Sequence, residues 1–340
     1  KREKMSYPNL FKYATKELSQ DAFICWLLAW ADKQHQDNEM HFIGKRFLEA
    51  LTNKFPEKNI PAIESINIYR QKFKIDILCL INTTFNEVLT TKNPPVNSLA
   101  IIIEDKVGAG IHGKQLEQYR KKIESLGFND SNILGVYLKT KDQKDYDGAK
   151  AQNYKPFIRR DILEVLSNGG NQILIDFREY WGNVESESLA YENTSHDQWD
   201  KSTSWRGFYK ALDAAGNLQG KWTIKSYSDP KPTYGGIFMM QKQECSLYIQ
   251  LCQSRLNFKI RVNDKNNFKR LRAKWTKFLK NMPLSDGIKI LEPKRSGFGK
   301  SMVVGYIESY IQTENKIPDI QNTVQYLNRI NLLMNEWEVV

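Results

Sequence analysis

The sequence is poor in the residues that build disulfide frameworks and zinc sites. It has 4 cysteines and 4 histidines among 340 residues. The cysteines are scattered, with Cys25 in a helical pattern, Cys79 in a strand pattern, and Cys245 and Cys252 at the ends of another apolar run. No two histidines have the spacing of zinc ligands. We therefore expect reduced cysteines that serve in packing, and neither a disulfide scaffold nor a zinc site.

Long apolar runs are also missing. No stretch approaches the roughly 18 consecutive apolar residues of a membrane-spanning helix, and the first ten residues, KREKMSYPNL, contain no apolar signal core. Hydrophobic residues still make up 41% of the chain and aromatic residues 12%, which is enough to bury two ordinary cores. We expect a globular cytoplasmic protein that does not contact a membrane and has two domains.

Negative charge is scarce in the second half of the chain. Residues 186–340 hold 23 Lys and Arg against 15 Asp and Glu, which is +8 of the total net charge of +11. Just before most of this basic region, the chain becomes polar and short of aliphatic residues. We therefore expect a first domain over 1–182, a polar linker over 183–204 and a basic α+β domain over 205–340.

The most basic segment of the second domain is KNNFKRLRAKWTKFLK, residues 265–280. Its apolar residues recur at helical spacing, which predicts an amphipathic helix with a basic outer face. Such a face can bind nucleic acid, lie on a membrane surface or simply be solvated, and the sequence leaves these alternatives open. The candidate nucleic-acid-binding residues on it are Lys269, Arg270, Arg272, Lys274 and Lys277.

Periodicity predicts the other elements of both domains. In the first domain the expected order is helices 15–33 and 41–54, strands 63–70, 73–81 and 99–106, helix 115–126 and strand 132–139, followed by 157–168 and 173–181 as two helices or as a strand and a helix. In the second domain we expect a helix over 205–215, strands around Trp222, Ile237, Leu247, Phe258, Ile290 and Val303, and a last helix over 319–337.

A charged triplet closes one of the predicted strands. Glu104, Asp105 and Lys106 follow an apolar run that ends at Ile103. An unpaired charge in a buried strand is costly, so these charges need a partner or a chemical role. Because side chains alternate along a strand, Glu104 and Lys106 should face one side of the sheet and Asp105 the other.

The preceding strand, residues 73–81, contains a single acid, Asp76. One antiparallel register pairs Leu80 with Ala100. The same register sets Asp76 opposite Glu104, with Cβ atoms roughly 4.5–5.5 Å apart. Two carboxylates this close repel each other unless a cation lies between them. The pattern therefore predicts a divalent ion with oxygen ligands, Mg²⁺ or Mn²⁺.

An Asp on one strand followed by Glu-x-Lys on the next is the pattern of the PD-(D/E)xK nuclease superfamily, which this chain resembles at Asp76, Glu104 and Lys106. Ile75 stands where the name of the motif places proline. The resemblance implies a restriction-endonuclease-like core of the α/β class, with element order αβββαβ and a mixed central sheet flanked by helices, followed here by the smaller α+β domain.

Two further segments add to the resemblance. Gln115 and Tyr119 in the following helix are similar to the Q-x-x-x-Y motif of the RecB-like exonuclease branch. The first helix, over residues 17–28, is similar to the N-terminal helix of another branch of the superfamily. The resemblance covers residues 10–182. It implies a metal-dependent nuclease that hydrolyses phosphodiester bonds of nucleic acid, with DNA as the expected substrate and a homodimer as an open possibility.

The resemblance also implies roles for the acids and the lysine. Asp76, Glu104 and the backbone carbonyl of Asp105 would hold Mg²⁺ or Mn²⁺ against the scissile phosphate. The ion would lower the pKa of a bound water and stabilise the charge of the transition state. Lys106 would orient that water or help to deprotonate it. Glu17, from the first helix, is a supplementary acid for the metal site by the same analogy.

The next helix would supply the remaining contacts. Gln115 would position the attacking water or a phosphate oxygen, and Tyr119, which shares its face, would hold the adjacent nucleic-acid backbone. Lys114, directly before the helix, is a candidate contact to nucleic acid.

Three alternatives depend on the same residues. In the first, Asp76 pairs with Lys106 and Glu104 pairs with Lys74 as structural salt bridges. In the second, the chain is an inactive relative that only binds nucleic acid. In the third, the segment 108–114 is a phosphate-binding loop of a nucleotide-binding protein, because it reads G-x-x-x-x-G-K between a strand and a helix. Gln115 then stands where a Ser or Thr should bind Mg²⁺.

Overall fold

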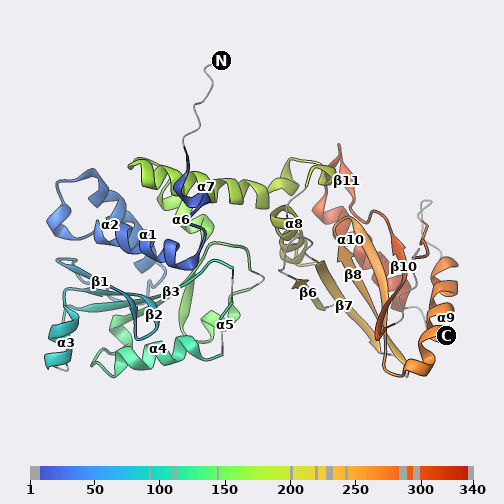
Figure 1. Cartoon of the computed structure of the whole chain (residues 1–340), viewed down its shortest axis with the longest axis horizontal. Helices are drawn as coiled ribbons and strands as arrows, with labels where there is room; N and C mark the ends of the chain where they lie inside the picture. Colours follow the sequence, from blue (N-terminus) through green and yellow to red (C-terminus); the bar gives the residue numbers. More distant parts are fainter. Residues whose placement is uncertain are drawn as a thin grey trace, which may run out of the picture. The chain divides into compact units, whose positions relative to one another are not determined.

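The chain folds into two compact units, residues 1–185 and 186–340 (Figure 1). The computed structural model describes residues 8–91, 93–108, 110–111, 113–143, 145–199, 202–218, 221–226, 233–241, 244–282, 289–293 and 299–335. None of the helices within these ranges is long and apolar enough to cross a membrane.

The first unit is an α/β fold around a mixed five-stranded sheet, as the sequence predicted. Strands β1, β2 and β3 are antiparallel neighbours, whereas β3, β4 and β5 are parallel. The elements are α1 (Glu17–Ala29), α2 (Glu39–Thr52), β1 (Ile66–Lys72), β2 (Ile75–Ile81), α3 (Phe85–Thr91), β3 (Leu99–Lys106), α4 (Gln115–Glu124), β4 (Ile133–Lys139), α5 (Asp147–Lys150), β5 (Tyr154–Ile158), α6 (Arg159–Val165) and α7 (Gln172–Ser188).

The register between β2 and β3 is the one that places Asp76 beside Glu104. Leu80 pairs with Ala100 and the ladder continues to Ile77 and Ile103, one residue before the two acids. Every residue of β3 is buried, because helices cover both faces of the sheet. The charged triplet at its end is therefore buried as well.

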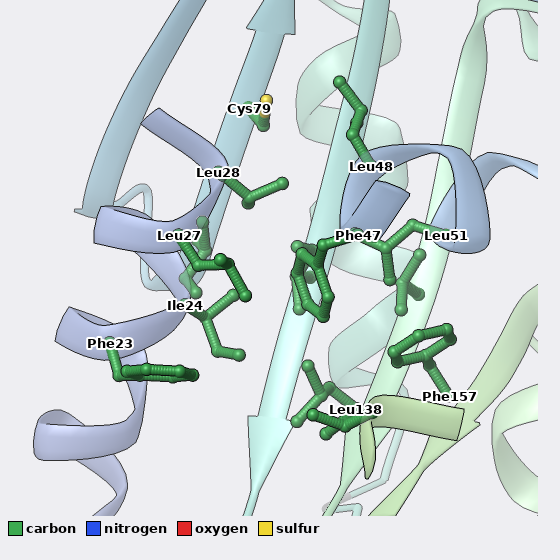
Figure 2. Packing of buried hydrophobic residues seen from close by; sticks show 14 of the residues in the cluster. Phe23, Ile24, Leu27, Leu28, Phe47, Leu48, Leu51, Cys79, Leu138 and Phe157 are labelled. Carbon is green, nitrogen blue, oxygen red and sulfur yellow. The ribbon is translucent and has the colours of Figure 1, made fainter. Parts of the chain in front are cut away.

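Two hydrophobic clusters flank this sheet. Alternate residues of β2 and β3 face α1, α2, α6 and α7 on one side and α3 and α4 on the other (Figure 1). Figure 2 shows the first cluster, where Phe23 and Leu27 of α1 and Phe47 of α2 pack over the strands. Gly44 lets these two helices approach closely, since a Cβ there would lie 2.7 Å from the backbone oxygen of Leu27. The packing fixes α1 against the strand that carries the triplet.

The second unit is built on a five-stranded antiparallel sheet with the order β10-β9-β8-β7-β6. Helices α8, α9 and α10 contribute to a single core with the inward residues of β8, β9 and β10. The elements are α8 (Ser202–Ala214), β6 (Lys221–Ser226), β7 (Thr233–Gln241), β8 (Cys245–Cys252), β9 (Arg255–Val262), α9 (Phe268–Lys280), β10 (Ser301–Ile307), β11 (Thr313–Glu314), β12 (Ile317–Pro318) and α10 (Ile320–Asn335).

Three sequence expectations need correction. Residues 183–199 and 202–204 of the range expected to be a polar linker are structured, because α7 continues to Ser188 and Trp199 is buried against Trp205 in the second core. The strand expected near Ile290 is reduced to one isolated bridge from Leu291 to β10. Helix α3 and strand β5 were not predicted as such, because their apolar residues fall in short runs of ambiguous period.

Candidate active site

Asp76, Glu104 and Lys106 converge at the ends of β2 and β3. The Nζ atom of Lys106 lies 2.6 Å from Oε1 of Glu104 and 3.5 Å from Oδ2 of Asp76. These two distances add to 6.1 Å, so the two carboxylate oxygens cannot be farther apart than that. One ion with oxygen ligands at about 2.0–2.6 Å could contact both carboxylates after a small side-chain movement.

Asp105 turns its side chain to the opposite face of the sheet. Its Oδ1 accepts a hydrogen bond of 2.5 Å from Nε2 of Gln20 in α1. Its backbone N–H donates to Oδ2 of Asp76 at 3.0 Å, and its backbone oxygen accepts from Nζ of Lys106 at 3.3 Å. The ammonium of Lys106 therefore touches all three groups that the sequence assigns to the metal: Asp76, Glu104 and the Asp105 carbonyl.

Gln115 and Tyr119 lie beside Glu104, at the start of α4. Nε2 of Gln115 donates to Oε1 of Glu104 at 2.9 Å and to the hydroxyl of Tyr119 at 2.5 Å. The four-residue spacing puts both side chains on one helix face. These two hydrogen bonds fix the position of the Gln115 side chain, and through it that of the Glu104 carboxylate.

The other predicted residues lie in different surroundings. Glu17 is in the first turn of α1, and its Oε1 accepts from the backbone N–H of Val107 at 3.1 Å, directly after the triplet. The side chain of Lys114 is 82% exposed, with Nζ 3.9 Å from Glu117. On α9, Lys269, Arg270 and Lys277 are exposed.

Arg272 and Lys274 of α9 are half-buried. Arg270 forms an ion pair with Glu244. The apolar side of α9 is buried in the second core, as its period predicted.

The site contains two carboxylates and one ammonium, so negative charge is in excess when both acids are ionised. Burial raises the pKa of Glu104 to about 7, and the charge of Asp76 adds to the rise although Lys106 opposes it. Burial alone would lower the pKa of Lys106, but its hydrogen bond to Glu104 and the charges of Glu104 and Asp76 raise it above the ordinary value. One ammonium therefore serves two carboxylates. Oε2 of Glu104 is buried and has no hydrogen-bond partner among the described residues.

These residues fit a divalent cation. Carboxylate and backbone carbonyl oxygens are hard ligands of the kind that Mg²⁺ and Mn²⁺ prefer. The uncompensated oxygen of Glu104 marks where additional positive charge would be stabilised. No group of three or more His, Cys, Asp or Glu side chains within the described ranges is arranged around one point for a metal. The candidate ligands Asp76, Glu104 and the Asp105 carbonyl differ from such a group because the third ligand is a backbone oxygen.

Several residues that support the site were not predicted from the sequence. Nε2 of Gln71 donates to Oδ1 of Asp76 at 3.0 Å and to Oδ2 of Asp21 at 3.3 Å. Gln71 has a φ of 56° near the end of β1, where the ladder with β2 pairs Arg70 and Lys72 but not Gln71, and such a local irregularity has no clear signal in the sequence. Lys139 pairs with Lys106 across β3 and β4, and burial lowers its pKa to about 8. In the sequence, the position of Lys139 at the end of an apolar strand is the feature that could have indicated its place near the site.

Behind the triplet, Asp21 and Asp105 form a buried pair of acids. Burial raises the pKa of Asp21 to about 6, and the charge of Asp76 adds to the rise. Burial raises the pKa of Asp105 well above its ordinary value, with the charge of Asp21 contributing. Oδ1 of Asp21 and Oδ2 of Asp105 are both without a hydrogen-bond partner in the described part of the chain. A proton shared by the two carboxyls would satisfy both oxygens.

An α/β core with a mixed sheet, and an Asp and a Glu-x-Lys meeting on its antiparallel strands, define a nuclease-type fold. Comparison with protein families supports this class, because the model of the PD-(D/E)XK nuclease superfamily matches residues 8–201, more than half of the chain. The chain belongs to the PD-(D/E)XK nuclease superfamily. No curated protein and no solved structure matches it. Membership implies a nuclease that acts on nucleic acid and generally uses divalent ions.

Proposed function

We propose that this protein is an Mg²⁺- or Mn²⁺-dependent nuclease that hydrolyses phosphodiester bonds of DNA at Asp76, Glu104 and Lys106. The observation that carries the proposal is the charge imbalance of the site. The buried carboxylate of Glu104 and the half-buried carboxylate of Asp76 share the ammonium of Lys106, and one oxygen of Glu104 has no donor among the described residues. A structure built only for stability would not be expected to keep an uncompensated carboxylate oxygen in its core.

Of the two ion pairs in the structural salt-bridge alternative, the contacts in the structure match one. The ion pair between Asp76 and Lys106 is present at 3.5 Å. Glu104, however, pairs with the same Lys106 at 2.6 Å. The alternative instead pairs Glu104 with Lys74. The site consequently retains a net negative charge when both acids are ionised, which favours a cation ligand.

The nucleotide-binding alternative receives less support. A phosphate-binding loop needs a Ser or Thr after its lysine to hold Mg²⁺, and this position is Gln115, which instead donates to Glu104. Two acids at the end of β3 would also repel a phosphate group bound there. Ala109 and His112 of the segment lie outside the described residues.

In the proposed mechanism, Asp76, Glu104 and the carbonyl of Asp105 would hold the divalent ion. When bound, the ion supplies a water of lowered pKa and positive charge beside the scissile phosphate. Lys106 orients the attacking water with its ammonium and stabilises the added negative charge of the transition state. Gln115 fixes the carboxylate of Glu104, and Tyr119 fixes Gln115.

Further contacts to the nucleic acid are proposed outside this centre. Lys114 precedes α4, and its exposed ammonium would bind a phosphate of the DNA backbone. The cationic residues of α9 named above would do the same for the second unit, each adding sequence-independent affinity. Glu17 is proposed to act by holding the backbone after Lys106 rather than as a metal ligand, because its carboxylate accepts from Val107.

A calorimetric titration with Mn²⁺ and with Mg²⁺ tests the metal site. The wild-type protein should bind either ion, and Asp76→Asn should lose this binding because it removes one of the two anionic ligands. Glu117→Gln is the matched control, since Glu117 is an exposed acid on α4 that pairs with Lys121. Equal binding by the wild type and Asp76→Asn would refute the metal site at this position.

A further inference from the structure

The carboxylate of Asp76 on β2 is held at both of its oxygens by donors from the two strands that flank β2. Oδ2 accepts from the backbone N–H of Asp105 at 3.0 Å and lies 3.5 Å from Nζ of Lys106, both on β3. Oδ1 accepts from Nε2 of Gln71 on β1 at 3.0 Å. Among the described residues, no second donor reaches Oδ1. Loss of the Gln71 amide would therefore release one end of this carboxylate.

The amide of Gln71 is itself fixed by a second acid. Besides Asp76, its Nε2 donates to Oδ2 of Asp21 on α1 at 3.3 Å. The amide nitrogen carries two hydrogens, one for each acid, whereas a reversed amide would place its oxygen against the carboxylate of Asp76. Asp21 is 1% exposed and lies on a helix that packs on the sheet. Gln71 therefore connects Asp76 to a buried and fixed side chain.

The backbone at Gln71 departs from that of a regular strand. The ladder between β1 and β2 pairs Arg70 with Ile77 and Lys72 with Ile75, and the same register sets Gln71 across from Asp76 without a ladder pair. Gln71 has a φ of 56°, in the left-handed region that residues with a Cβ rarely adopt. A local irregularity of a strand can re-aim a side chain. Here the amide of Gln71 ends on the two acids.

Fold stability alone does not explain a glutamine at this position. Gln71 is exposed, so its side chain contributes little to the packing of the core. Glycine or asparagine would adopt the left-handed backbone with less strain. Glycine has no amide, however, and the amide of asparagine is one methylene shorter. Strained backbone positions concentrate at functional sites, and the length of the Gln71 side chain is explained by its two acceptors.

We propose that Gln71 is a positioning residue of the metal site, which holds the carboxylate of Asp76 in the orientation that binds the divalent ion. The inference rests on the proposed function, because Asp76 is a ligand only if the site binds metal. Carboxylates that bind a metal are themselves held by hydrogen bonds, and loss of such a partner commonly costs about 10–100-fold in metal affinity. In this role Gln71 acts through Asp76 and does not itself contact the ion.

The test measures two properties of the full-length protein: its affinity for Mn²⁺ by calorimetric titration without nucleic acid, and its melting temperature in EDTA. Gln71→Met keeps the length of the side chain and removes both donated hydrogen bonds. This variant should bind Mn²⁺ about tenfold or more weakly than the wild type. A glutamine that served only the fold would give the opposite pattern, with a lower melting temperature and an unchanged affinity for Mn²⁺.

A second variant separates metal affinity from fold stability. Gln71→Asn keeps an amide but shortens the side chain, and asparagine suits the left-handed backbone better than glutamine does. Its melting temperature in EDTA should therefore equal or exceed that of the wild type, while its affinity for Mn²⁺ falls about tenfold or more. A protein that is at least as stable as the wild type but binds the ion more weakly cannot owe the weaker binding to unfolding.

Gln253 is the matched control, because it is also a glutamine in the left-handed region, with a φ of 55°, and it lies between β8 and β9 of the second unit. Gln253→Met and Gln253→Asn should leave the affinity for Mn²⁺ within about twofold of the wild type. Equal affinity of the wild type and Gln71→Met, or equal weakening by the Gln253 variants, would overturn the inference and leave the metal site in place. A wild type that binds no Mn²⁺ would instead overturn the proposed function, and this inference with it.

Discussion

Lys106 determines the charge balance of the active site. Its ammonium is in contact with Asp76, Glu104 and the carbonyl of Asp105, and it is only 8% exposed. The two acids are close enough to repel each other, so a cation is needed there for stability as well as for the chemistry. The same lysine stabilises the fold without metal and, in the mechanism we propose, the transition state of cleavage.

Replacement of Lys106 by methionine tests both roles. The cleavage rate should fall by about 100-fold or more, because one electrostatic partner of the transition state is lost. The melting temperature in EDTA should also fall, since the buried Glu104 and the half-buried Asp76 lose the ammonium that they share. Added Mg²⁺ should restore much of this melting temperature. The exposed Lys45→Met provides the control, and a Lys106→Met protein that cuts at the wild-type rate would contradict the assigned role.

Asp21 and Asp105 give the fold a pH dependence of defined sign. A raised pKa of a buried acid means that the folded protein keeps a proton that the unfolded chain has released. The contribution of Asp21 to stability is thus complete below about pH 4 and is lost as the pH rises through about 6. Asp105 and Glu104, whose pKa values are also raised by burial, act in the same direction.

Asp21→Asn should flatten this dependence. Asparagine does not ionise, and its amide can donate a hydrogen bond to the unsatisfied Oδ2 of Asp105. At pH 7.5 the variant should be more stable than the wild type by about 1–3 kcal/mol, whereas at pH 4.5 the difference should be small. Thermal unfolding from pH 4.5 to 8 measures this, with the exposed Asp37→Asn as control. A variant that is less stable than the wild type at pH 7.5 would show that the pair is not held by a shared proton.

The juxtaposition of Asp76, Glu104 and Lys106 in the candidate site could be predicted from the sequence, and the reason is strand alternation. The positions of Asp76, Glu104 and Lys106 follow from a period of two and one hairpin register, both of which the apolar residues specify. The contacts of Gln71, Asp21 and Lys139 could not be predicted in this way. They depend on how the end of β1, helix α1 and the parallel strand β4 meet the triplet in space, and no short-range pattern encodes such contacts.

Helix α1 illustrates how elements position the site. Its apolar residues pack with α2 on the sheet, and its polar residues Gln20, Asp21 and Glu17 reach the end of β3. Figure 2 shows how closely α1 and α2 lie above the strands. The period of the two helices could be predicted from the sequence, but their close approach at a glycine could not, because it depends on a tertiary contact.

Gly44→Ala tests that approach. The new Cβ would lie 2.7 Å from the backbone nitrogen of Ala31 and 2.7 Å from the oxygen of Leu27, so the helices must separate. We expect a loss of about 1–3 kcal/mol of unfolding free energy. Gly182→Ala in α7 is the matched control, because nothing lies within 4 Å of its Cβ and helix propensity should raise stability by about 0.5–1 kcal/mol. Chemical denaturation of both variants measures the difference, and equal effects would contradict the close packing.

At the scale of the whole molecule, the two units differ in how far a known protein family covers them. The match to the nuclease superfamily ends at residue 201, so it covers the first unit and leaves most of the second without a family. The second unit has its own core and carries +8 of the net charge of +11. Length and charge predict two domains joined by a polar linker over 183–204. Within that range, α7 and the buried Trp199 occupy a stretch whose composition resembles a linker.

The central claim, that Glu104 belongs to a metal-dependent catalytic centre, is tested most directly by DNA cleavage in Mg²⁺. Glu104→Gln keeps the size of the side chain and a carbonyl oxygen that can accept from Lys106, but it removes the charge needed to hold the ion. We expect no measurable cleavage by this variant, with a melting temperature in EDTA equal to or above that of the wild type, while Glu117→Gln cuts normally. A Glu104→Gln protein that still cuts DNA in Mg²⁺ would contradict the account. A variant that loses activity because its unfolding free energy falls by several kcal/mol would contradict it as well, since that is the effect of breaking a structural buried ion pair.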